Sequence, residues 1–120
     1  MSVRAASSAR KPGRAAPGSD EDTVTAASDL AATLRAQGDH PAARALDEDV
    51  LSWRQRVLGE DHPHTIGAVA NLAVTLSRLG DAAAARVLRA EVVARRRRVL
   101  GENHPATIQA EAALVDLDGS

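Results

Sequence analysis

Apolar residues recur along this chain at helical spacing, and short polar turns separate the groups. In residues 20–37 the apolar positions lie three and four apart, which is the pattern of an amphipathic helix. Four more segments repeat this pattern, over about residues 41–58, 63–79, 82–100 and 105–117. The four clearest stripes are Ala27, Leu30, Ala31 and Leu34; Leu46, Val50, Trp53 and Val57; Ile66, Val69, Leu72, Ala73 and Leu76; and Leu88, Val92, Arg95 and Val99. Because period-two alternation extends over only a few residues anywhere, the pattern predicts an all-α fold.

Turns that contain Gly, Asp, His or Pro close the predicted helices. The acidic run 20–22 lies where the first helix should begin, and acids there interact favourably with the helix dipole. Gly59 suits the left-handed residue that ends a helix. We expect Asp61 or His62 to cap the helix that begins at Pro63. Connections this short predict helices that pack as antiparallel pairs.

A long sequence repeat divides the chain into units. The segment 56–66 returns almost letter for letter as 98–108, which is 42 residues later. A fixed offset of this kind indicates a repeat protein. The expected fold is a short α-solenoid of antiparallel helix pairs, with two and a half repeats in five helices. The repeat domain should cover residues 20–118, with units of about 20–61, 62–103 and 104–118.

Residues 1–19 lack the apolar periodicity of the rest. They contain Arg4, Arg10, Lys11 and Arg14 among Ser, Ala, Pro and Gly, so they cannot bury enough surface to offset their ordering entropy. We predict a disordered basic tail here. A transit peptide shares the Arg- and Ser-rich character, but it would need an amphipathic helical pattern that this segment lacks.

The overall composition excludes several classes of function. The 120 residues carry a formal net charge of −1, so no global field favours nucleic acid or an anionic membrane surface. There is no cysteine, which excludes disulfides, thiol nucleophiles and zinc–thiolate sites. No apolar run reaches the ~18–20 residues of a membrane helix. We therefore expect a cytoplasmic protein without a membrane or nucleic-acid partner.

The polar residues do not combine into a recognisable catalytic, metal or cofactor site. His62 and His64 lie two residues apart at a helix start and point to different sides, so they cannot easily share a metal ion. Asp47, Glu48 and Asp49 are expected on an exposed face, outside any pocket that could separate carboxylate pKa values. No phosphate-binding Gly-rich loop occurs. The prediction is a protein that is not an enzyme and holds no cofactor and no metal.

The run Arg95–Arg98 is the one concentration of charge. At about 100° per residue its members spread around the helix instead of forming a stripe. In the last turns of a helix they complement its negative end, so a solvated, helix-stabilising run is expected. An acidic peptide or another anion is the alternative interpretation.

The pattern Asn71-Leu72-Ala73, Leu76, Gly80-Asp81 and Ala84-Ala85-Arg86 resembles a tetratricopeptide repeat, together with the Leu-Gly-Glu-Asp-His-Pro linker of residues 58–63, which returns with Asn in place of Asp at residues 100–105. More narrowly, the 42-residue length and the linker resemble the variety found in kinesin light chains and in arrays attached to bacterial regulatory ATPases. The resemblance implies a helical scaffold in which the first helix of each pair lines a concave groove for a peptide or protein.

Some positions depart from the family's pattern. Positions that are usually aromatic hold Asp47 and Arg89 here. Trp53 and Arg95 occupy equivalent positions in successive units. We expect Trp53 in the core, buried by the unit that follows it, and Arg95 half covered, with its stem over apolar surface and its charge in water.

The resemblance also assigns a register to the expected groove. It places Asn71 and Asp29 at one groove position, with Arg35 and Arg78 further along the same helices. The function predicted is a non-catalytic scaffold that binds a protein or peptide through these four residues. The alternatives are a self-association module, paired through the C-terminal edge as a homo-oligomer, and a truncated remnant of a longer regulatory array.

Overall fold

The computed structural model describes residues 20–119, and the predicted basic tail 1–19 lies outside them. The described residues form five consecutive α-helices, so the predicted all-α fold is confirmed. The helix ends agree with the periodicity to within about two residues, because the turn residues fix them. The helices are α1 Glu21–Ala36, α2 His40–Leu58, α3 Pro63–Arg78, α4 Ala82–Leu100 and α5 Pro105–Gly119.

Side-chain caps and left-handed glycines explain why the helices begin and end where they do. The Asp20 carboxylate accepts a hydrogen bond from the Thr23 amide at 2.9 Å, and Asp39 and Asp81 cap α2 and α4 in the same way. At α3 the cap is His62, whose Nδ1 accepts from the His64 amide at 3.0 Å, so the choice between Asp61 and His62 is settled. Gly59 ends α2 with φ of 91°, which residues with a Cβ rarely adopt.

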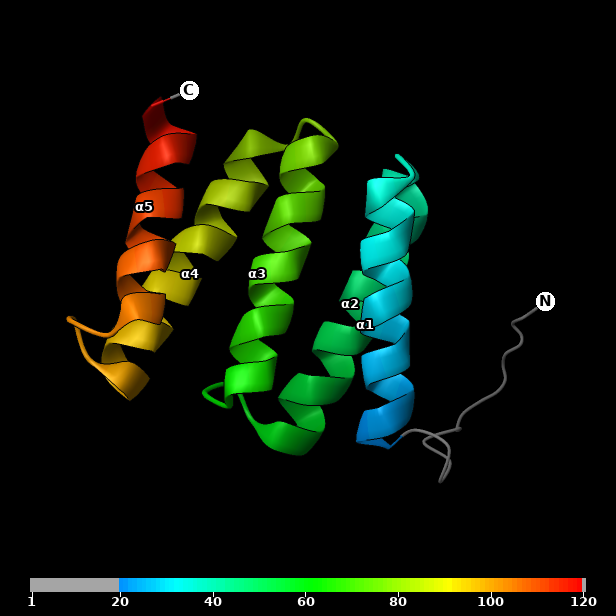
Figure 1. The fold of residues 1–120 in the computed structure, drawn as a ribbon, viewed down its shortest axis with the longest axis horizontal. Coiled ribbons are helices and arrows are strands. Elements are labelled where there is room, and N and C mark those ends of the chain that lie inside the picture. Colours follow the sequence, from blue (N-terminus) through cyan, green and yellow to red (C-terminus); the bar gives the residue numbers. More distant parts are fainter. Residues whose placement is uncertain (1–19, 120) are drawn as a thin grey trace.

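The helices form two rows. Helices α1, α3 and α5 lie side by side in one row, while α2 packs against both α1 and α3, and α4 against both α3 and α5 (Figure 1). Each helix therefore contacts mainly the helices next to it in sequence. This arrangement is a short solenoid of antiparallel pairs. None of the five described helices has the length and apolarity needed to cross a bilayer.

Helix α3 carries the centre of the core. On one side Ala68 packs with Val24 and Val50, and on the other Ile66 and Val69 pack against α4 and α5. All five residues of its predicted stripe are buried, as expected. Three predictions for the other helices are wrong, since Leu30, Val57 and Val99 are 50%, 56% and 41% exposed. Helix α1 packs mainly on α2, so it buries only the narrow line through Val24 and Ala31.

The expectations for Trp53 and Arg95 are also corrected. Arg95 is 5% exposed, and its guanidinium donates to the Glu60 carbonyl at 3.2 Å and to the Glu91 carboxylate at 2.7 Å. Trp53 is only half-buried, against Val24 and Val50. This position faces the preceding unit, not the following one: Arg95 meets the linker before α3, whereas no described helix precedes α1 to cover Trp53.

Candidate functional site

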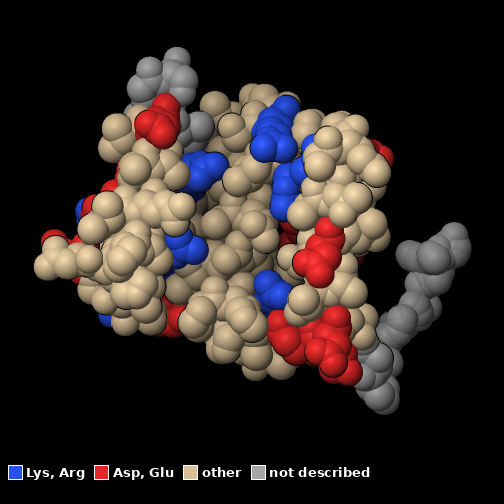
Figure 2. Space-filling view, viewed as in Figure 1, with Lys and Arg blue, Asp and Glu red and all other residues tan. Residues whose placement is uncertain are grey.

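The row of helices α1, α3 and α5 presents a face with two hollows. Figure 2 shows basic side chains gathered in the hollow between α1 and α3 and in the hollow between α3 and α5. Acidic side chains gather at the end where α1 begins (Figure 2). Helix α2 forms the floor of the first hollow and helix α4 the floor of the second. We call the hollow between α1 and α3, with α2 as its floor, the first layer, and the hollow between α3 and α5, with α4 as its floor, the second layer. The two layers differ in the charges they hold.

In the first layer an ion pair connects all three helices. Arg35 of α1 donates from Nη1 to both carboxylate oxygens of Asp47 of α2, at 3.0 and 2.9 Å. The Thr75 hydroxyl of α3 donates to Asp47 Oδ2 at 2.5 Å and accepts from Arg35 Nη1 at 3.0 Å. The Asp47 side chain is 3% exposed, so its expected place on an exposed face was wrong. A buried carboxylate is stable here because a cation and a hydroxyl satisfy it.

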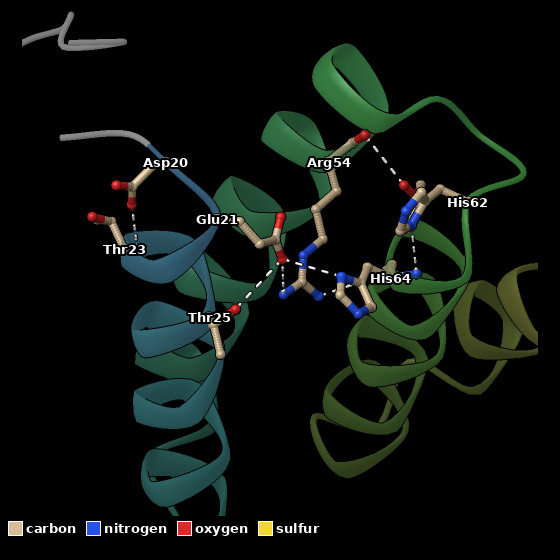
Figure 3. A network of polar contacts seen from close by, with 8 residues as sticks. Asp20, Glu21, Thr23, Thr25, Arg54, His62 and His64 are labelled. Carbon is tan, nitrogen blue, oxygen red and sulfur yellow. Dashed lines mark hydrogen bonds and ion pairs between the residues drawn. The ribbon is translucent and has the colours of Figure 1, made fainter. Parts of the chain in front are cut away.

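At the other end of the first layer a second ion pair joins the same helices (Figure 3). Arg54 of α2 donates from Nη2 to Glu21 Oε1 at 3.1 Å and from Nη1 to the His64 carbonyl at 3.3 Å. His64 Nδ1 also lies 3.2 Å from Glu21 Oε1. Thr65 closes the network, because its hydroxyl donates to the Arg54 carbonyl at 3.2 Å. The two cations of this layer are thus each matched by an acid.

The second layer holds a pocket of about 190 Å³ between α3 and α5. Small side chains form most of its walls, and two arginines of α4 lie at its floor. Arg89 has no hydrogen-bond or ion-pair partner among the described residues. Arg96 donates from Nη1 to the Ala106 carbonyl at 3.4 Å. The lining residues are Ala70, Arg89, Val92, Arg96, Gln109, Ala110 and Ala113.

The arginines at the end of α4 have separate partners. Arg95 reaches Glu60 and Glu91, Arg97 pairs with Glu111 of α5, and Arg98 donates to Asp61 Oδ1 at 2.6 Å. The hydrogen bond from Arg98 lowers the pKa of Asp61 and raises that of the guanidinium. The expected solvated run is therefore wrong for Arg95, while Arg97 fastens α4 to α5 and Arg98 fastens it to the turn before α3.

The structure places the four predicted groove residues as follows. Asn71 is half-buried on α3, and its carbonyl accepts from the Thr75 hydroxyl at 3.3 Å. Arg35 meets that same hydroxyl, so these two residues are connected through Thr75. Asp29 and Arg78 are exposed on α1 and at the end of α3. None of the four lines the pocket between α3 and α5. Their part in binding stays a prediction.

Sequence reasoning missed the buried polar groups that shape this face. Asp47 stands at a position that is usually aromatic in the family that the sequence resembles, and an acid there was a signal of a buried partner. Arg35 lies twelve residues earlier, across the turn between α1 and α2, so an antiparallel pairing could have suggested it. The matched pair of Glu21 and Arg54 joins residues 33 positions apart, which a single sequence does not reveal.

The described residues contain no group of three His, Asp or Glu side chains placed to hold a metal ion. The sequence profile described as tetratricopeptide repeat matches residues 22–88, which is more than half of the 120-residue chain. No curated protein matches the chain.

Proposed function

Because the chain belongs to the tetratricopeptide repeat family, we propose that it is a non-catalytic interaction module that binds a protein or peptide segment on the α1, α3 and α5 face. The supporting observation is the pair of hollows on that face, which both hold arginines, and the small side chains that line the hollow between α3 and α5. Ala70 and Ala113 let a main chain approach the helices closely. The mechanism is docking on a surface that is already formed.

The predicted groove residues have distinct roles in this proposal. The Asn71 amide can both donate to and accept from an extended peptide backbone. Asp29 and Arg78 are exposed, so they can offer charged contacts at the rim. The side chain of Arg35 is 10% exposed and its guanidinium is held by Asp47, so its contribution would be to position the wall beside Asn71.

The proposal can be tested with the whole chain as bait in an extract of its source cells. The variants Asn71→Ala and Arg78→Ala should reduce the recovery of the bound partner by about 10-fold. The expected loss follows from removing hydrogen bonds to charged or backbone groups. Quantitative mass spectrometry measures the recovery, and far-UV circular dichroism confirms that each variant folds.

Matched controls come from the opposite surface. Arg44 of α2 and Val87 of α4 are exposed and lie on the opposite row of helices. Their Ala variants should retain the partner. A partner that is lost with Arg44→Ala or Val87→Ala but kept with Asn71→Ala would contradict binding at the proposed face.

The narrower identity is also proposed. The 42-residue unit and the recurring His-Pro linker support the kinesin-light-chain-like variety of the repeat. In the structure this linker has a defined role, since both His62 and His104 cap the following helix through Nδ1, each at 3.0 Å. A stretch of a longer regulatory array remains the alternative, and further repeats encoded beside this segment would support it.

Self-association is a second candidate because the outer surface of α4 and α5 includes exposed apolar side chains. A hollow there is lined by Ala90, Val93, Ala94, Leu114 and Val115 together with the ion pair of Arg97 and Glu111, and Val115 is 66% exposed. If two copies pair at this edge, the average mass measured by light scattering after size exclusion should rise with protein concentration toward the mass of a dimer. Val115→Glu should then return the monomer. A monomer at every concentration would exclude this candidate.

A further inference from the structure

The two layers of the binding face hold equivalent residues, which allows one to serve as a reference for the other. The 42-residue offset relates Arg54 to Arg96 and His64 to Ala106. The structure repeats the contact between them: Arg54 Nη1 donates to the His64 carbonyl at 3.3 Å, and Arg96 Nη1 to the Ala106 carbonyl at 3.4 Å. The two arginines therefore occupy the same place in their layers.

The layers differ in their acids. In the first, Arg35 is paired with Asp47 and Arg54 with Glu21, so the charges are balanced. In the second layer, the position equivalent to Asp47, 42 residues later, holds an arginine, Arg89. The positions equivalent to Arg35 and Glu21 hold Ser77 and Pro63, neither of which carries charge. The floor of the second layer therefore has two cations, and none of these four equivalent positions holds an acid.

We propose that the pocket formed by Arg89 and Arg96 between α3 and α5 binds carboxylate side chains of an acidic protein segment. This inference rests on the proposed function and names its partner class. Arg89 is half-buried without a partner among the described residues, and partial removal from water strengthens its attraction for an anion. Its planar guanidinium can hold a carboxylate through two parallel hydrogen bonds.

The geometry suits an extended segment that runs along the helices. Arg89 and Arg96 are seven residues apart on α4, which corresponds to roughly 10 Å at 1.5 Å per residue. In an extended chain alternate side chains point to one side, about 6.5–7 Å apart. Two acids of such a segment can therefore reach the two guanidinium groups. Ala70 and Ala113 border the pocket and leave room for the main chain, while the Gln109 amide can bind its polar groups.

The test uses a fluorescent eight-residue peptide that alternates Glu and Ala, together with a matched peptide that alternates Gln and Ala. Fluorescence anisotropy measures the affinity of the full chain for each. We expect the Glu peptide to bind at least 10-fold more tightly than the Gln peptide. Arg89→Gln and Arg96→Gln should each weaken binding of the Glu peptide about 10-fold, and Arg89→Lys should weaken it less because it keeps the charge.

Arg56→Gln is the matched control. Arg56 is exposed on α2 and lies outside the pocket. Its substitution changes the net charge by the same amount, so the affinity for the Glu peptide should stay within about 2-fold of the wild-type value. In NMR titrations the backbone signals of Ala70, Gln109 and Ala113 should move as the Glu peptide is added. Each variant should retain the wild-type circular dichroism spectrum, since neither pocket arginine has an acid partner among the described residues.

Several outcomes would overturn the inference. Equal weakening by Arg56→Gln and Arg89→Gln would show non-specific attraction, and absence of binding to the Glu peptide at about 1 mM would show that the pocket takes no carboxylate. A peptide with phosphoserine in place of Glu is a further arm, and binding more than 10-fold tighter than that of the Glu peptide would assign the pocket to phosphate. If the partner in the extract is lost with Asn71→Ala but kept with Arg89→Gln, the proposed function stands and this inference fails.

Discussion

Single residues in this protein take their role from the unit next to them. Arg95 and Trp53 occupy equivalent positions, and yet the arginine is the more deeply buried of the two. Arg95 bridges to Glu60 in the turn before α3, while Trp53 faces the side where no described helix lies. A side chain at this position therefore joins two units when a preceding unit exists. Burial here follows the place in the stack more than the hydrophobicity of the residue.

The ion pair of Arg98 and Asp61 predicts a pH effect at the same turn. The hydrogen bond from Arg98 lowers the pKa of Asp61 from its ordinary 3.8, so the folded pKa lies below the unfolded one. The stabilisation is complete above the unfolded pKa and is lost as pH falls through the folded pKa. In Arg98→Gln the pKa of Asp61 should rise toward 3.8, as followed by the side-chain carboxyl carbon in NMR titrations.

Arg97→Gln provides the comparison for this measurement. Arg97 pairs with Glu111 and not with Asp61, so the Asp61 titration should stay as in the wild type. Both partners of the Arg98 pair are more than half exposed, and the effect on stability should be small compared with the shift in titration. An unchanged Asp61 titration in Arg98→Gln would show that the hydrogen bond does not form in solution.

At the scale of the elements, the sequence predicted the features that depend on local pattern and missed the contacts that depend on packing between helices. The helices and their ends follow from apolar spacing, from capping side chains and from Gly59, all of which act within a few residues. Only a three-dimensional neighbour decides whether a polar residue is buried. Asp47 is in contact with α1 and α3 at once, and only its place in the repeat, not the residues around it, distinguishes it from the exposed Glu48.

The same comparison holds for the candidate site. The resemblance supplied the face and the residues on α1 and α3, because these helices come first in their pairs. The pocket arginines were not predicted, since Arg89 and Arg96 belong to α4, the second helix of its pair. Their significance appears only when Arg89 is compared with Asp47 in three dimensions.

The network around Asp47 predicts a large effect on stability. Asp47→Ala leaves the Arg35 cation nearly buried without its acid, and we expect the free energy of unfolding to fall by about 3–5 kcal/mol. Glu48→Ala removes a neighbouring acid whose side chain is 51% exposed, and its effect should stay within about 0.5 kcal/mol. Urea denaturation followed by circular dichroism gives both values.

A double variant tests whether the cost comes from the stranded charge. Arg35→Met together with Asp47→Leu removes both charges and keeps apolar volume between α1 and α2. This variant should be more stable than Asp47→Ala alone, because no unpaired ion remains. If Asp47→Ala and Glu48→Ala prove equally mild, the buried pair does not contribute as its geometry indicates.

At the scale of the whole molecule, α3 is the helix that both layers share. The cluster of Val24, Val50 and Ala68 lies on one side of it, and that of Val69 and Ala110 lies on the other. Each outer helix packs mainly on its neighbour in sequence, so stability in this stack is a sum of local interfaces. The layer with the pocket arginines can therefore be perturbed while the first layer stays folded.

This independence gives a prediction that uses Trp53, the single tryptophan, as a reporter of α1 and α2. Ala110 lies on the buried side of α5 and is 7% exposed, and Ala110→Asp should detach that helix because a buried carboxylate without a partner is costly. Far-UV circular dichroism should lose the signal of about the 15 residues of α5, while the urea midpoint of Trp53 fluorescence changes little. Ala112→Asp, at an exposed position of the same helix, should leave both signals intact. A Trp53 midpoint that falls together with the helical signal would mean that the two layers unfold as one unit, in which case occupation of the Arg89 pocket would stabilise the whole face and not only its second half.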